Sequence, residues 1–118
     1  MAKLAKDSGA RFISVLEPNR YASSFSHPTE DLKFVDRQTD AHLPGLRGIM
    51  PKALAQLSAG NASLKGQGIE TLDLSTIFKD KTQNLFTDGA GHFNSIGNAM
   101  VADRLAAVIL SSAAAAQP

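Results

Sequence analysis

The sequence predicts an α/β fold with a short parallel sheet. Three observations support this prediction: an apolar run at residues 11–16, an alternating run at residues 69–74, and a helical apolar stripe after residue 94. A helix, a glycine and a buried strand in succession, as at the start of this chain, are typical of half of a parallel α/β unit. We therefore expect a three-layer α/β domain, or part of one, with at least two neighbouring parallel strands.

The composition narrows the class of protein. The chain has 118 residues, of which 43% are hydrophobic and 19% charged, and this fits a single globular domain over residues 1–118. A net charge of +1, with scattered basic residues, gives no electrostatic basis for binding nucleic acid or an anionic membrane. The absence of cysteine excludes disulfides, thiolate catalysis and cysteine-ligated zinc. We expect neither a metal nor a cofactor.

The chain also shows no segment that predicts membrane insertion or export. Its N-terminus lacks the apolar core of a signal peptide, and its longest apolar run, residues 105–110, is far too short to span a bilayer. As encoded, the protein is expected to be cytoplasmic, although secretion of a longer parent is compatible with the sequence.

The first strand is expected at residues 11–16. These residues are mostly apolar with little alternation, which predicts a strand covered on both faces. Residues 2–8 fit the last turns of a helix, with Gly9 just beyond its end. The strand would expose an apolar edge, and a two-stranded sheet is marginal alone. We therefore expect a homodimer or a swapped assembly that joins sheets across this edge.

Two helices are expected in the middle of the chain, with a loop over residues 38–44 between them. Thr29 fits the cap of a helix over about residues 30–37. A second helix begins at Leu46 or at Pro51, because proline is tolerated in a first turn and kinks a helix elsewhere. Its apolar stripe ends near residue 57.

The second strand and the last helix follow a predicted loop over residues 60–68, which is rich in glycine. Residues 69–74 alternate between apolar and polar side chains, as in a strand with one exposed face. Asn94 or Ser95 caps the final helix, which frays into a flexible tail over residues 113–118. The apolar face expected for this helix comprises Met100, Val101, Leu105, Val108 and Ile109.

His92 is the best-placed candidate for acid–base chemistry. It lies in a loop directly before the final helix, where a ring can face a cleft on a fixed backbone. Asp88 precedes it in the same loop, and Gly89 and Gly91 give the backbone freedom to fold the carboxylate onto the ring. Gly97 would let the helix approach its neighbours closely. The structural alternative is a helix-entry histidine bonded to a loop carboxylate.

The segment from His92 to Asn98 resembles a motif of the SGNH (GDSL-type) ester hydrolases. In that family the catalytic acid and base occur as D-x-x-H, often continued as H-x-N-x-x-G-N before a terminal helix, and residues 92–98 match the second pattern in full. Residues 14–18 and 72–78 are similar to other parts of the family's C-terminal half. The resemblance implies a flavodoxin-like SGNH half: a partial three-layer α/β/α fold with a short parallel sheet and a C-terminal amphipathic helix.

The resemblance also implies an enzyme, a carboxylic-ester hydrolase of the esterase or lipase type that acts on a small ester or lipid. His92 would be the base and Asp88 would orient it. Two features depart from the family pattern. The spacing from Asp88 to His92 is D-x-x-x-H, which is one residue longer, and the family's nucleophile and oxyanion blocks are not present in the sequence.

The other site residues are therefore proposed from their positions in the sequence, because no family motif assigns their roles. Ser24, in the loop after the first strand, and Ser95, next to the histidine segment, are candidate nucleophiles. Tyr21 and Asn94 are candidate substrate-binding residues. The alternative function is a non-catalytic α/β module, a truncated or degenerate hydrolase half that self-associates or binds a partner.

Overall fold

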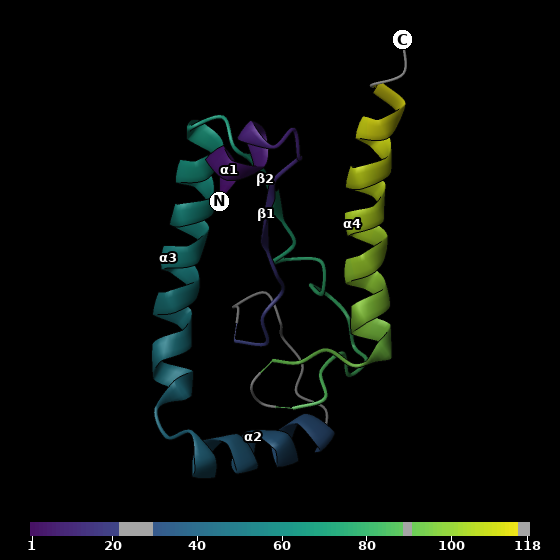
Figure 1. The fold of residues 1–118 in the computed structure, drawn as a ribbon. Helices are drawn as coiled ribbons and strands as arrows, with labels where there is room; N and C mark the ends of the chain where they lie inside the picture. The colour runs from purple at the N-terminus through teal and green to yellow at the C-terminus, as the bar shows by residue number, and fades with distance from the viewer. Residues whose placement is uncertain (22–29, 89–90, 116–118) are drawn as a thin grey trace.

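The computed structural model describes residues 1–21, 30–88 and 91–115, which form four helices and a two-stranded parallel sheet (Figure 1). The predicted mixed α/β class and the parallel pairing of the two strands are thereby confirmed. The elements in chain order are α1 (Ala2–Asp7), β1 (Ile13–Leu16), α2 (Glu30–His42), α3 (Leu46–Gly66), β2 (Glu70–Asp73) and α4 (Ser95–Ala115).

The sheet pairs β1 with β2 in parallel, with Val15 opposite Leu72. The amide of Leu74 extends this pairing by donating to the carbonyl of Leu16 at 2.8 Å. All four β1 residues are half-buried, which is less than expected for a strand covered on both faces. The reason is that, within the described part of the chain, α3 is the one helix in extensive contact with both strands.

The start of the chain forms as its sequence predicts. Helix α1 ends at Asp7, and Gly9 takes the left-handed conformation at φ +72° just beyond it. Glycine adopts this conformation without the steric cost of a Cβ atom. The turn leads directly to the start of β1.

Helix α2 is longer than predicted, because residues 38–42 continue it where a loop was expected. These residues include neither glycine nor proline, so nothing local ends the helix before them. It ends instead at a turn from Leu43 to Leu46, closed by a backbone hydrogen bond of 3.2 Å. Within this turn Pro44 precedes Gly45, whose φ is +87°, and this is the residue order that a type II turn requires. Thr29, the predicted cap, lies outside the described residues.

Helix α3 begins at Leu46, contains Pro51 within it and continues to Gly66. The predicted end near residue 57 and the predicted loop over residues 60–68 are therefore wrong. A single glycine costs a helix only about 1 kcal/mol relative to alanine. Packing of α3 on both strands outweighs the cost at Gly60.

The buried core lies beyond the end of β2 rather than on the sheet. It consists of Leu74, Phe78, Leu85, Phe86 and Val101. The ring of Phe78 packs edge-on against the rings of Phe86, at 5.6 Å between centroids, and Phe93, at 5.4 Å. Aromatic pairs favour such edge-to-face contacts. The core thus joins the loops after β2 to the first half of α4.

Helix α4 follows the prediction in its first half and departs from it in its second. Val101 is buried, and Met100 and Leu105 pack against the core. Ile109, predicted on the same apolar face, is 53% exposed, because the core does not reach it. The helix continues to Ala115, so it includes the start of the predicted tail, and residues 116–118 lie outside the described residues.

The molecule is elongated, with extents of 53 × 25 × 21 Å and a radius of gyration of 16.7 Å. In Figure 1, α3 runs alongside the strands, α2 lies across one end, and the C-terminal end of α4 projects from the other. A compact domain of this length would have a radius of gyration of about 13.5 Å. No helix in the three described ranges is long and apolar enough to cross a membrane.

Candidate active site

A short hairpin carries the candidate residues. Phe86 and Phe93 form an antiparallel bridge. Beyond the bridge, the amide of Thr87 donates to the carbonyl of His92 at 2.8 Å. Both phenylalanines pack on Phe78, so the base of the hairpin is anchored in the core. Thr87 and His92 therefore both adjoin residues that are packed in the core.

Within this turn the side chain of Asp88 folds back onto His92. Asp88 Oδ2 lies 2.5 Å from His92 Nδ1. The other oxygen, Oδ1, accepts hydrogen bonds from the amides of Gly91 at 3.0 Å and His92 at 3.2 Å. Gly91 has a φ of +106°, which favours glycine at this position. The D-x-x-x-H spacing therefore still brings the carboxylate to the ring.

The same contacts set the charge state of Asp88. Partial burial would raise the pKa of the Asp88 carboxyl, but the hydrogen bonds from the His92 ring and from the two amides outweigh this effect. Together with the charge on His92, they hold the pKa of Asp88 below its ordinary value. Asp88 is therefore ionised at neutral pH and can accept a hydrogen bond from the Nδ1–H group of the ring.

The second ring nitrogen of His92 is available for chemistry. When Nδ1 donates to a carboxylate, the neutral ring carries its lone pair on Nε2. The His92 side chain is 77% exposed, so solvent reaches this nitrogen. Within the described ranges no serine hydroxyl contacts the ring. The pair can take up a proton from a nucleophile or a water molecule that approaches Nε2.

Arg20 links the loop after β1 to this turn, and no pattern in the sequence predicts this contact. Its guanidinium donates to the carbonyl of Asp88 at 3.0 Å and lies 5.6 Å from the ring centroid of Tyr21, in cation–π range. Arg20 and Asp88 are 68 residues apart, so no local pattern could have paired them. The contact brings the half-buried candidate Tyr21 to the same end of the sheet as the pair.

Asn94 has a structural place beside the pair. Its Oδ1 accepts from the amides of Ile96 and Gly97, both at 3.0 Å, and so caps α4. Its Nδ2 donates to the carbonyl of Asn84 at 2.7 Å. Of the two predicted caps, Asn94 is therefore the one that bonds the helix. Its predicted part in substrate binding stays a prediction.

The two candidate nucleophiles differ in what can be said of them. Ser95 is the first residue of α4 and is exposed. Ser24 lies in residues 22–29, outside the described residues. Neither role is decided by the geometry of the described part.

Gly97 confirms the predicted close approach at the start of α4. The residue is buried, and a Cβ atom placed on it would lie 2.6 Å from the carbonyl oxygen of Leu85 and 3.1 Å from the Cβ of Phe93. No side chain fits at this distance without movement of the backbone. The helix therefore begins tightly against the base of the hairpin that carries His92.

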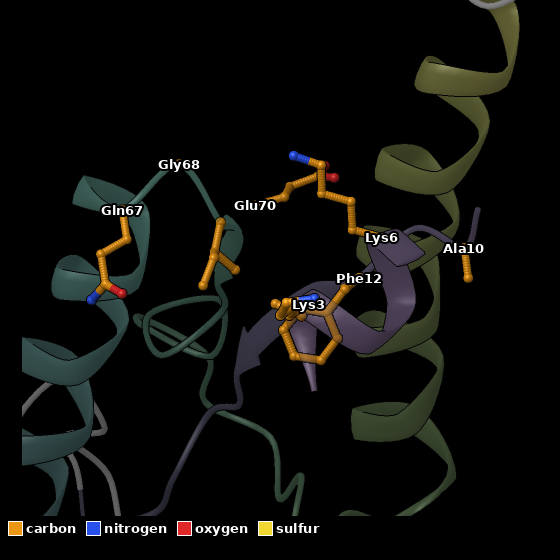
Figure 2. A pocket seen from close by; sticks show the side chains of 9 residues that line it. Lys3, Lys6, Ala10, Phe12, Gln67, Gly68 and Glu70 are labelled. Carbon is orange, nitrogen blue, oxygen red and sulfur yellow. The ribbon is translucent and has the colours of Figure 1, made fainter. Parts of the chain in front are cut away.

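A separate pocket of about 420 Å³ lies at the opposite end of the sheet (Figure 2). Side chains from α1, from the segment before β1 and from the turn between α3 and β2 surround it, among them Lys3, Lys6, Phe12 and Gln67. It precedes both strands, whereas the His92 turn follows β1 and β2, so it is no part of that site. Within the described residues, no group of three histidine, aspartate or glutamate side chains could hold a metal ion.

Comparison of the chain with protein-family models, with curated proteins and with solved structures finds no match.

Proposed function

We propose that this protein is a carboxylic-ester hydrolase in which His92 is the general base and Asp88 orients it. The observation that carries the proposal is the 2.5 Å contact between Asp88 Oδ2 and His92 Nδ1, with the ring otherwise open to solvent. This arrangement fixes the tautomer that a base needs and stabilises the imidazolium formed during the reaction. A small ester or lipid would be the substrate.

The relationship to the SGNH hydrolases belongs to this proposal. It rests on the match of residues 92–98 to the family motif and on the reach of Asp88 across the longer spacing. The three-layer arrangement of that family's domain is part of the same proposal. The capped start of α4 and the buried Gly97 give the asparagine and the glycine of the motif a structural reason to be present.

The nucleophile in this proposal is a serine, either Ser24 or Ser95, or else a water molecule that His92 activates. Arg20, in the loop after β1, donates to the Asp88 carbonyl, and Ser24 follows Arg20 in the sequence. Ser95 is exposed, and it follows His92 closely in the sequence. In either case Nε2 would take the hydroxyl proton as the oxygen attacks the ester carbonyl.

Hydrolysis of short- and medium-chain p-nitrophenyl esters tests the proposal. His92→Ala should reduce the rate about a hundredfold or more, as expected for loss of a general base, and Asp88→Asn should also reduce it. Exposed histidines can cleave activated esters without a site. His42→Ala is the matched control, because His42 is exposed at the end of α2 and its loss should remove only this background cleavage.

Three comparisons decide the outcome. Equal rates for the unchanged protein and His92→Ala, or equal losses from His92→Ala and His42→Ala, would overturn the enzyme proposal. A fluorophosphonate probe followed by mass spectrometry identifies the nucleophile. Labelling that Ser24→Ala or Ser95→Ala abolishes assigns the residue, and turnover without labelling assigns an activated water.

The second candidate function is a non-catalytic module that self-associates through its sheet. The observation in its favour is the open edge of β1, beside which no strand lies in the described part of the chain. In that case the Asp88–His92 pair would serve only to close the turn before α4. A folded protein without ester turnover would favour this function.

A further inference from the structure

One edge of the sheet presents unpaired backbone groups. Leu16 accepts its hydrogen bond from Leu74, so the backbone groups of Leu16 and Ser14 face β2. Because backbone direction alternates along a strand, the N–H and C=O groups of Ile13 and Val15 face the opposite edge. No described strand lies there. Such an edge is a template for another strand.

A groove of about 400 Å³ follows this edge. Ser14, Val15 and Leu16 line it on one side and residues of α3, among them Leu57 and Leu64, line it on the other. No residue of β2 borders it. The groove therefore runs between the free edge of β1 and helix α3, where a neighbouring strand would lie.

The groove also contains an unsatisfied polar atom. Asn61, on the α3 side, has a buried Oδ1 that accepts no hydrogen bond in the described structure. A buried acceptor without a donor costs roughly 1–3 kcal/mol in a folded protein. Because this atom is inaccessible to solvent, a donor on an incoming segment reaches it only if the Asn61 side chain rotates. The groove lining offers such an occupant polar as well as apolar groups.

The exposed surface indicates how large the occupant is. The accessible area is 7892 Å². A monomeric protein of this mass would expose about 6,200 Å², so the excess is about 1,700 Å². Each partner of a standard interface buries roughly 800 Å². Part of the excess lies on α3, where Leu57 lines the groove and is 56% exposed and Ile49, about two turns before it, is 63% exposed.

We propose that a second copy of this chain occupies the groove, with β1 pairing antiparallel to the partner copy's β1 about a two-fold axis. Ser14 would then face its own counterpart across the axis, and Ile13 would pair with the partner copy's Val15. Both of these residues have outward backbone groups, so each pair can exchange two hydrogen bonds. The proposal stands independently of the ester-hydrolase proposal.

The positions of the helices fit this arrangement. In the joined sheet, the centres of the two strand pairs would be two strand spacings apart, or about 9.6 Å. Helix α3 contacts both strands of its own pair, so the two α3 helices would be separated by a similar distance. Packed helices lie about 8–10 Å apart. The exposed Ile49 and Leu57 would thus be brought to the α3–α3 contact.

Sedimentation velocity at about 10 μM tests the association. The unchanged protein should sediment with the mass of two chains, and Leu57→Glu should shift it to the mass of one, because a charge would enter the contact. Leu110→Glu is the matched control, since Leu110 is 67% exposed on α4, away from the groove, and should leave the dimer intact. Circular dichroism checks that each variant is folded. A folded monomeric unchanged protein, or equal dissociation by both variants, would overturn the proposal.

Cross-linking identifies the edge. The chain has no cysteine, so a disulfide in a single-cysteine variant must join two copies. Ser14→Cys should form the dimeric disulfide under mild oxidation, because facing residues of antiparallel strands lie within the Cα separation that a disulfide spans. Thr71→Cys, on the free edge of β2, should not. The reverse result would overturn the assignment to the β1 edge.

Discussion

The Asp88 carboxylate accepts hydrogen bonds from the His92 ring and from the amides of Gly91 and His92, and these contacts determine how acid should affect the stability of the turn. The folded pKa of Asp88 is lowered, so its contribution to stability is fully present above the ordinary carboxyl pKa of about 3.9. That contribution is lost as the pH falls through the lower pKa of the folded state. The sign follows from the folded state binding the proton less tightly than the unfolded state.

We therefore expect Asp88→Asn to be less stable than the unchanged protein at pH 6, with the difference shrinking as the pH falls towards 2. Urea unfolding at a series of pH values measures the two curves. His92→Gln removes the ring contact and keeps both amide donors. The difference in unfolding free energy between His92→Gln and the unchanged protein should therefore change less with pH than the difference for Asp88→Asn. Parallel curves for Asp88→Asn and the unchanged protein would contradict the prediction.

Gly97 makes a second prediction at the residue scale. An added Cβ would lie 2.6 Å from the Leu85 carbonyl oxygen, which belongs to the base of the hairpin and cannot move freely. Gly97→Ala should destabilise the fold by about 1–3 kcal/mol through overpacking. The control is Gly48→Ala on α3, where nothing lies within 4 Å of the new atom. That change should stabilise by about 0.5–1 kcal/mol, because alanine favours helix. Denaturant titration of both variants should give changes of opposite sign.

At the residue scale, the sequence predicted the contacts between residues that are close to each other in the chain. The Asp88–His92 pair and the Asn94 cap join residues at most four positions apart, and the backbone approach at Gly97 is to Leu85, twelve positions away. Arg20 could not be predicted, because its contact with Asp88 exists only after β1 and the hairpin have been brought together. Contacts between residues that are close in the sequence can be predicted from that short stretch alone, whereas a contact between distant segments depends on the whole fold.

Among the elements, α3 contains a residue, Pro51, whose effect on stability can be tested directly. Pro51 lies beyond the first turn of the helix, where its missing N–H removes a hydrogen bond. Pro51→Ala should stabilise the protein by up to about 3 kcal/mol. Pro44→Ala is the contrasting variant, because Pro44 lies in the turn before Gly45 and pre-sets its backbone. That change should destabilise by about 0.4–1 kcal/mol. Thermal melts followed by circular dichroism compare them, and a destabilised Pro51→Ala would mean that the proline is needed for packing.

The elements were predicted in type and order more reliably than in extent. Both strands and the final helix lie where their apolar patterns indicated. The ends of α2 and α3 were placed too early, since polar residues and Gly60 resemble a loop when read alone. Contact with the sheet keeps α3 helical past Gly60, and the turn at Pro44 and Gly45 ends α2. Tertiary packing decided the first boundary and turn chemistry the second.

At the scale of the whole molecule, the structure has a large accessible surface area, and few of its described hydrophobic residues are buried. The five buried core residues lie beyond the end of β2, while α3 and the second half of α4 expose Ile49, Leu57, Ile109 and Leu110. The sequence predicted the open strand edge, because an apolar strand had too few partners. It could not predict which groove borders that edge, since α3 was expected to end before Gly60.

If two copies share one sheet, the stability of each chain depends on its concentration. For a folded dimer that unfolds to two chains, a tenfold increase in concentration adds about 1.4 kcal/mol per dimer. Two chains of this length gain an unfolding entropy of about 500 cal/mol/K, so the melting temperature should rise by about 3 °C for each tenfold increase. Melts of the unchanged protein between about 1 and 100 μM measure this slope. Leu57→Glu should abolish the slope and Leu110→Glu should retain it, whereas superimposable melts of the unchanged protein across that range would show that the chain folds alone.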